Sequence, residues 1–184
     1  EGWVAEQARQ PCPVLSLSMA RGRSTEGVQG FDISLYNDLM VLGRKRGLPM
    51  LRKDTEGALG AFKDVLEGLY DQGGPVVVLI DEYDKPILDK IGDLEAAEAM
   101  REALRSFYTV LKDYDSHLRF VMLTGISKFT KTGVFSAMNN LRDISMSESF
   151  GDIAGYTQEE LERDFSDWID DAAGKMGFSR QELL

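Results

Sequence analysis

The sequence predicts an α/β fold in which helices flank a parallel sheet, followed by the start of a small helical element. The run Val76–Ile80 is apolar at every position, which is typical of a strand covered on both faces. Strand and helix patterns alternate along the 184 residues, and this order favours parallel strands joined by right-handed crossovers. Hydrophobic residues make up 43% and charged residues 28%, as in an ordinary globular domain.

The first elements are one strand and two helices. Residues 13–19 alternate apolar and small polar side chains, which predicts a strand. Apolar residues recur at helical spacing over residues 31–46, and we expect Asp32 to cap that helix. A second helix begins at residues 54–56 and ends at residues 73–74, a pair of glycines before the apolar run.

The elements after the apolar run are a helix, a strand and a helical tail. Residues 93–115 carry an apolar stripe at helical spacing, and residues 118–124 form the next strand, which Gly125 ends. Thr157 and Ser179 each begin a capping box, with Glu three residues later. The apolar face expected for the helix after the first box consists of Leu161, Phe165, Trp168 and Ile169.

These patterns divide the chain into two parts. We expect a core domain over residues 1–154 and the beginning of a helical lid over residues 155–184. The chain opens at Glu1 with neither a Met nor a basic and apolar leader segment. We therefore expect it to be a piece of a longer, cytoplasmic protein.

Composition excludes several classes of site. The chain has 21 basic and 31 acidic side chains, so its net charge of −10 argues against a surface that binds duplex nucleic acid. Cys12 and His117 are the single cysteine and histidine, which excludes an internal disulfide, Cys-rich metal sites and multi-His zinc centres, and argues against Ser-His-Asp catalysis. The longest aliphatic run is far shorter than the roughly 20 apolar residues of a membrane-spanning helix.

The strongest candidate site is the pair Asp81 and Glu82, directly after the apolar run. Ligands of open α/β sheets bind at the carboxyl ends of the strands. At that position Asp81 can hold Mg²⁺ through its water shell, and Glu82 can activate water for attack on a terminal phosphate, as in a Walker B strand. The same pattern also fits a buried strand whose acidic end begins a surface turn, with Pro86 enforcing the turn.

A polar residue ends the next predicted strand. Thr124 follows an apolar segment, and one helix separates that segment from Asp81. Because neighbouring parallel strands end at the same edge of a sheet, Thr124 is well placed to orient the attacking water or to contact the terminal phosphate.

A rival interpretation groups Asp81, Glu82 and Asp84 as the metal cluster of a nuclease or phosphatase. It requires further acidic ligands, and the other predicted strand ends supply none. The chain also lacks a Gly-x-x-x-x-Gly-Lys-Ser/Thr loop, whose backbone N–H groups would cradle phosphates. That loop is therefore either upstream of Glu1 or missing from the protein.

Four segments carry a resemblance to a known family. They are residues 79–87 (LIDEYDKPI), 123–129 (LTGISKF), 135–144 (FSAMNNLRDI) and 155–161 (GYTQEEL). In order and spacing they resemble the AAA-ATPase-like family of predicted bacterial P-loop ATPases, whose members typically carry a downstream nuclease-like domain of the PD-(D/E)XK superfamily. The resemblance implies a P-loop NTPase-like sheet and the use of ATP and Mg²⁺.

The resemblance also implies roles for individual residues. Asp81 would be the acid associated with Mg²⁺, and Glu82 the base that activates water. Thr124 would be the sensor of the terminal phosphate, with Ser127 as a neighbour in the nucleotide site.

Two further residues have alternative interpretations. Asn140 belongs to an Asn pair that would either read a phosphate or cap the turn before Leu141. Arg142 would act either as a charge-neutralising finger from a neighbouring subunit or as an ordinary solvated charge.

We therefore expect part of an ATP-binding and ATP-hydrolysing domain that works in a full-length, homo-oligomeric protein and contacts neither membrane nor nucleic acid through this segment. The first alternative is a non-hydrolysing regulatory or interaction module that keeps the sheet but has lost the phosphate loop. The second is the metal-dependent nuclease or phosphatase. An intact upstream phosphate loop would count against the first alternative, and Mg²⁺ binding without nucleotide would distinguish the second.

Overall fold

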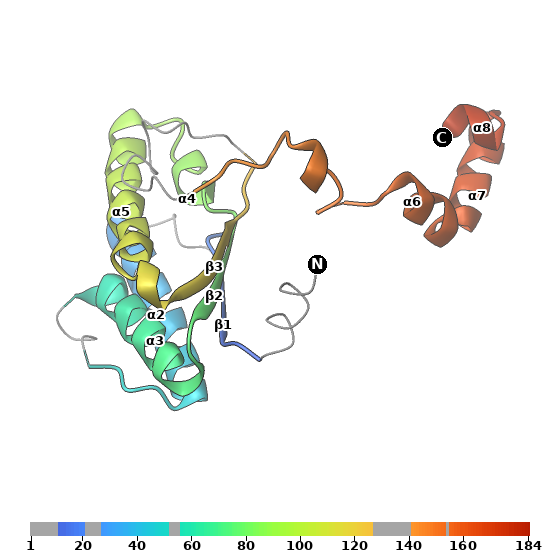
Figure 1. Ribbon diagram of the computed structural model, residues 1–184. Helices are drawn as coiled ribbons and strands as arrows, with labels where there is room; N and C mark the ends of the chain where they lie inside the picture. Colours follow the sequence, from blue (N-terminus) through green and yellow to red (C-terminus); the bar gives the residue numbers. More distant parts are fainter. Residues whose placement is uncertain (1–10, 21–26, 52–55, 127–140, 154) are drawn as a thin grey trace. The chain divides into compact units, whose positions relative to one another are not determined.

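The computed structural model describes residues 11–20, 27–51, 56–126, 141–153 and 155–184 (Figure 1). The chain divides into two compact units, residues 1–140 and residues 141–184. Within the described ranges, no helix is both long and apolar enough to cross a membrane.

The first unit is built on a three-stranded parallel sheet in the order β1-β2-β3. The strands are β1 (Val14–Ser18), β2 (Val76–Asp81) and β3 (Leu118–Leu123). Val78 of β2 is in register with Leu15 of β1 and with Val121 of β3. The sheet and its helices confirm the predicted α/β class, and each predicted strand agrees with the observed one to within one residue at either end.

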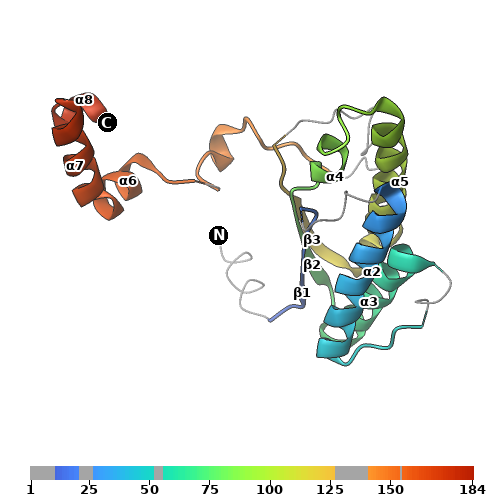
Figure 2. The same cartoon turned by 180° about the vertical axis from the view of Figure 1, so that it is seen from behind.

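The described helices of the first unit all connect parallel strands. Both crossovers step across the sheet in the same direction, so right-handed connections place their helices on the same face. Figures 1 and 2 show this single helical layer from opposite sides. The connecting elements are α2 (Gly27–Arg46), α3 (Gly57–Gly73), α4 (Lys85–Leu88), α5 (Leu94–Asp113) and the 3-10 helix η1 (Asp115–His117).

The core lies between the sheet and these helices. Val76, Val78 and Ile80 of β2 are buried on the helical side, where Phe62 of α3 stacks on Phe107 of α5 with 4.4 Å between ring centroids. Val77 and Leu79 point to the other face and are only half-buried. The prediction that β2 is buried on both faces is therefore wrong for the described part of this unit, because both crossovers run the same way.

Asp32 caps a different helix from the one predicted. Helix α2 begins at Gly27, so Asp32 lies inside it rather than at its start. The Asp32 carboxylate instead accepts a hydrogen bond of 3.1 Å from the backbone N–H of Ala58, in the first turn of α3. A short polar side chain thus supplies a free helical N–H group with a partner from another element.

The second unit contains short helices with local caps. They are the 3-10 helix η2 (Glu148–Phe150), α6 (Gln158–Asp164), α7 (Ser166–Met176) and α8 (Arg180–Leu183). Both predicted capping boxes, at Thr157 and Ser179, are present. The single helix expected after Thr157 is divided at Phe165, and Trp168 is 74% exposed rather than part of an apolar face.

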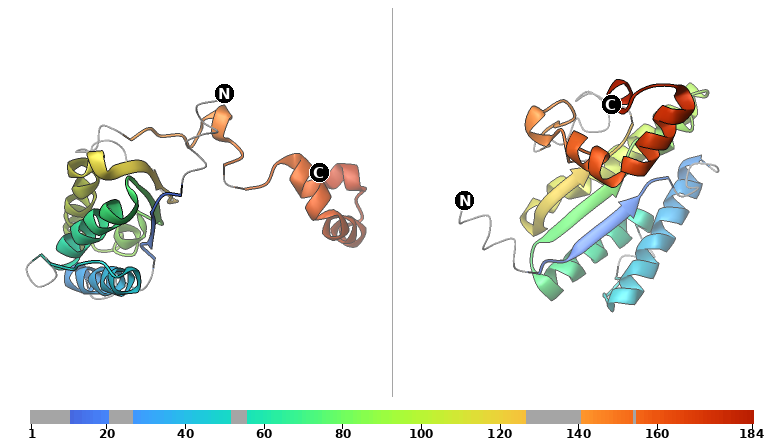
Figure 3. Two further views of the ribbon diagram at one scale, coloured as in Figure 1. Left: turned by 60° about the horizontal axis from the view of Figure 1, so that its bottom comes forward. Right: turned by 90° about the vertical axis from the view of Figure 1, so that its right-hand side faces the viewer.

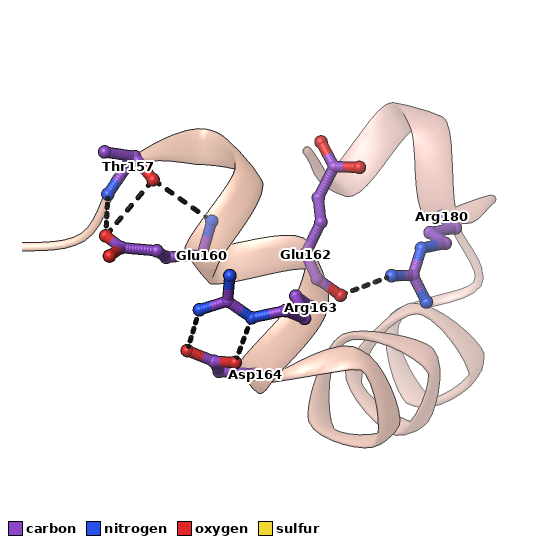
Figure 4. A network of polar contacts seen from close by, with 6 residues as sticks. All are labelled: Thr157, Glu160, Glu162, Arg163, Asp164 and Arg180. Carbon is purple, nitrogen blue, oxygen red and sulfur yellow. Dashed lines mark hydrogen bonds and ion pairs between the residues drawn. The ribbon is translucent and has the colours of Figure 1, made fainter.

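Hydrogen bonds stabilise this unit within α6 and between α6 and α8 (Figure 4). The backbone N–H and the hydroxyl of Thr157 donate to Glu160 over 3.0 and 3.1 Å, and they hold the pKa of that carboxyl below its usual range. Arg163 donates twice to Asp164, over 2.7 and 2.9 Å. Arg180 donates to the carbonyl oxygen of Glu162 over 3.1 Å, which joins α8 to α6.

Candidate functional site

The candidate site lies where β2 and β3 end. Beyond the last sheet residues, the backbone N–H of Thr124 donates to the carbonyl of Ile80 over 2.9 Å. The N–H of Tyr83 then donates to the carbonyl of Thr124 over 3.0 Å. These two bonds hold the ends of the adjacent parallel strands together, and polar residues therefore gather at the edge where such sheets bind ligands.

Asp81 and Thr124 meet at this edge. The Thr124 hydroxyl donates to Oδ1 of Asp81 over 2.5 Å, and the backbone N–H of Glu82 donates to the same oxygen over 3.0 Å. Asp81 is exposed, and no hydrogen bond from a described residue reaches its Oδ2. One carboxylate oxygen is thus fixed by the protein while the other faces solvent.

Glu82 has an unusual backbone. Its φ of 54° lies in the left-handed region, where residues other than glycine are uncommon. The chain leaves β2 at this residue and turns toward α4. The Glu82 carboxylate is half-exposed and makes no hydrogen bond or ion pair with the described residues. Strained conformations of this kind are concentrated at functional sites.

A buried layer supports the turn. Tyr83 and Asp84 are 8% and 1% exposed, and the Tyr108 hydroxyl of α5 donates to the Tyr83 carbonyl over 3.1 Å. Gly125 packs directly on this layer, since a Cβ atom there would lie 2.6 Å from Oδ1 of Asp84 and 2.7 Å from Cε1 of Tyr83. The sequence identified Gly125 only as the end of a strand.

The supporting roles of Tyr108, Asp84 and Gly125 were not predicted from the sequence. One signal was available for Tyr108, a hydroxyl-bearing residue within the otherwise apolar stripe of residues 93–115. A buried tyrosine hydroxyl usually has a hydrogen-bond partner. That partner is a backbone carbonyl of the turn that follows β2.

The residues present fit a magnesium ion held through water. Mg²⁺ retains several waters and takes only one or two carboxylates, and Asp81 offers one solvent-facing oxygen. Across the described ranges, no group of three or more His, Cys, Asp or Glu residues is arranged to hold a metal. The rival cluster of Asp81, Glu82 and Asp84 is therefore not formed, because Asp84 is buried beneath the turn.

Three further site residues were predicted from the sequence. Ser127 and Asn140 lie outside the described residues. Arg142 is exposed and belongs to the second unit. Their proposed roles stay predictions.

Most of the first unit matches a known protein family. Residues 6–135 match the family described as "Predicted AAA-ATPase". The chain belongs to this family. It is also 37% identical over 157 residues to an uncharacterized protein in the vnfD 5' region of Azotobacter chroococcum mcd 1. That match covers 84% of this chain and 29% of the relative, so the chain spans less than a third of the relative's length. No solved structure matches.

The family match covers part of the candidate site. It spans β1 to β3 and includes Asp81, Glu82, Thr124 and Ser127. Asn140 and Arg142 lie beyond it. The family thus supports an ATPase-like domain around the edge formed by β2 and β3.

Proposed function

We propose that this chain supplies the magnesium-associated acid and the catalytic base of an ATP-hydrolysing domain in a longer protein. The observation that carries the proposal is the 2.5 Å hydrogen bond from Thr124 to Asp81 at the ends of two adjacent parallel strands. Glu82 follows directly, in a left-handed backbone and with a carboxylate that has no described partner.

Each side chain has a distinct chemical task in this proposal. Asp81 would hold the Mg²⁺ ion through a water on Oδ2, and the bound ion would neutralise charge on the terminal phosphates. Glu82 would accept a proton from water as that water attacks the phosphorus. The Thr124 hydroxyl donates a hydrogen bond to Asp81. Its oxygen can still accept a hydrogen bond, and it could in this way orient the attacking water.

The proposal needs a phosphate-binding loop elsewhere in the longer protein, and the sheet topology indicates where it would fit. The strand before this loop would pair with the outer edge of β3, and a helix would lead from the loop back to β1. This connection would cross the sheet in the direction opposite to both described crossovers. A right-handed connection would then place that helix over the second face, where Phe120 is exposed and Val77 half-buried. The loop after this strand would lie beside Thr124.

The wider assembly is also part of the proposal. Residues 155–184 would begin a lid that responds to nucleotide, and Arg142 would reach the terminal phosphate of a neighbouring subunit in a homo-oligomer. A nuclease-like domain would follow in the longer protein. A cytoplasmic location is proposed because the reaction consumes cytoplasmic ATP.

The alternative of a non-hydrolysing module rests on a sequence observation, the lack of a phosphate-binding loop within these 184 residues. In that case Asp81 and Glu82 would only shape the turn after β2. The two hypotheses make opposite predictions for conservative changes at Glu82, because a turn tolerates Gln and a catalytic base does not.

The experiment measures ATP hydrolysis by the full-length protein and three variants. Removal of a general base typically costs about 10²- to 10⁴-fold in rate, so Glu82→Gln should retain ATP but lose turnover by that factor. Asp81→Ala should lose the magnesium-dependent rate. Glu102→Gln changes an exposed carboxylate on α5 and serves as the matched control, with the wild-type rate expected.

Wild-type hydrolysis by both Glu82→Gln and Asp81→Ala would contradict the assignment. Absence of ATP binding by the intact protein would instead favour the non-hydrolysing module. Circular dichroism of every variant checks that the fold is retained.

A further inference from the structure

Strand β1 is an outer strand of the sheet, on the side away from β3. Its outer edge is unpaired in the described part of the chain. Strand β1 pairs only with β2 there. The carbonyl of Pro13 accepts from the N–H of Val77, and the N–H of Met19 donates to the carbonyl of Asp81, each over 2.9 Å. Main-chain groups of the odd-numbered residues therefore face β2.

Main-chain groups of successive strand residues point to opposite sides, so those of the even-numbered residues of β1 point away from β2. The N–H and C=O groups of Val14, Ser16 and Ser18 point away from β2, where they are available to a further strand. Exposed edges in proteins are usually protected by charged side chains, proline or a bulge. Residues 14–18 contain no charged residue and no proline, and β1 pairs with β2 without a register shift.

A groove runs along this open edge. It has a volume of about 370 Å³, and both β1 and α2 line it. Figure 3 shows that α5, α3 and α2 lie in a row on one face of the sheet. Helix α2 is at the end of this row, beside β1. The lining of the groove includes Ser16, Ser18, Val41, Leu42, Lys45 and Arg46.

Apart from Asp38, the residues of α2 that line the groove are apolar or basic. Val41 is 42% exposed and Leu42 is half-buried, which leaves apolar surface for a side chain to cover. Lys45 and Arg46 lie in the last turn of α2, are exposed, and make no ion pair with a described residue. In a chain of net charge −10, two such cations side by side favour an acidic partner.

We infer that this groove binds an extended, acidic peptide segment of a partner protein, which adds to β1 as a fourth strand. Main-chain hydrogen bonds to Val14, Ser16 and Ser18 would supply affinity, as in other proteins that extend an exposed sheet edge. An apolar side chain of the peptide would cover Val41 and Leu42. An Asp or Glu would face Lys45 and Arg46, and this charge pairing would set the preferred sequence.

The test selects peptides from a phage library of random nine-residue sequences on the whole chain, and measures the selected peptides by fluorescence anisotropy. We expect enriched sequences that combine β-branched residues with Asp or Glu. Ser16→Pro should weaken their binding at least tenfold, because proline removes an outward N–H without removing a bond to β2. The double variant Lys45→Glu, Arg46→Glu should weaken binding equally.

Controls separate the groove from general charge and folding effects. The double variant Arg105→Glu, Lys112→Glu makes the same charge change at exposed positions of α5 and should leave binding within twofold. If Ser16→Pro does not fold, the Lys45 and Arg46 double variant decides the outcome, since both side chains are on the surface.

Two results would overturn the inference. One is a selection that yields no acidic extended sequence, or peptides that bind the Lys45 and Arg46 double variant as well as wild type. The other is a dimer of the chain, seen by sedimentation, that Ser16→Pro dissolves, because the edge would then bind a second copy instead of a peptide.

Discussion

The two units of this chain are stabilised in different ways. In residues 1–140, side chains distant in sequence share one core, such as Phe62 stacked on Phe107. In residues 141–184, the buried hydrophobic side chains among those described are Ile169 and Ala173, while Trp168 is 74% exposed. The second unit relies on local hydrogen bonds, chiefly its two capping boxes.

The difference shows that local hydrogen bonds can stabilise a helix without a large core, whereas a shared core needs contacts between distant segments. Caps at Thr157 and Ser179 satisfy N–H groups that a helix start leaves open, whatever packs nearby. The sheet unit cannot form from local signals alone, because parallel strands pair only across long connections. Mutations should therefore have large effects in the first unit and small ones in the second.

The largest effect is expected for Phe62→Ala. Phe62 is fully buried, and its removal leaves a cavity beside Phe107 that the rigid sheet and helices cannot close. Such changes typically cost about 3–5 kcal/mol in the free energy of unfolding. Urea denaturation followed by circular dichroism measures the change, and a loss below about 1 kcal/mol would contradict the proposed core.

A smaller effect is expected for Gly125→Ala, which tests the packing beneath the site. The new methyl group would meet Asp84 and Tyr83 at 2.6 and 2.7 Å, and overpacking of this kind costs about 1–3 kcal/mol. Gly92→Ala is the matched control, because no atom lies within 4 Å of its added Cβ. Equal unfolding midpoints for the two variants would exclude the tight contact.

In the second unit, Thr157→Ala should remove the capping box of α6. Loss of an N-cap hydroxyl costs about 1 kcal/mol of helix stability. Amide hydrogen exchange over residues 158–164 should become faster, while exchange in α5 should stay unchanged because Asp93 caps that helix independently. Protection that is unchanged throughout α6 would show that packing, not the cap, holds this helix.

The same cap predicts a pH dependence. The pKa of Glu160 is lowered by the backbone N–H and hydroxyl of Thr157, so the unfolded chain binds this proton more readily than the folded one. The stabilisation is complete above the ordinary pKa near 4.5 and is lost as the pH falls through the lower folded value. NMR shifts of α6 amides should follow this loss. Glu160→Gln keeps the cap but should abolish the titration.

The smallest effect is expected for Trp168→Ala. Substitution of a side chain that is 74% exposed usually changes stability by no more than about 0.5 kcal/mol, despite the size of the indole. Urea denaturation of the chain should therefore show the wild-type midpoint. A destabilisation comparable with that of Phe62→Ala would mean that the indole is buried in solution.

Sequence patterns located the strands well because each strand has a local signature. The run Val76–Ile80 and the segment before Thr124 were both predicted as strands, and both are. Helix ends were less predictable, since α2 begins before Asp32 and that residue caps α3 instead. Periodicity also joined α6 and α7 into one helix, because it does not detect the break at Phe165.

The sequence by itself determined the order of strands and helices, the acidic pair after β2 and the capping boxes, since these depend on residues close together in the chain. Only the tertiary structure decided that Thr124 bonds Asp81, that Gly125 packs on Asp84, and that α2 and β1 form a groove. The first two contacts join segments that crossover helices separate. Their geometry follows from strand register and crossover handedness, which no local pattern contains.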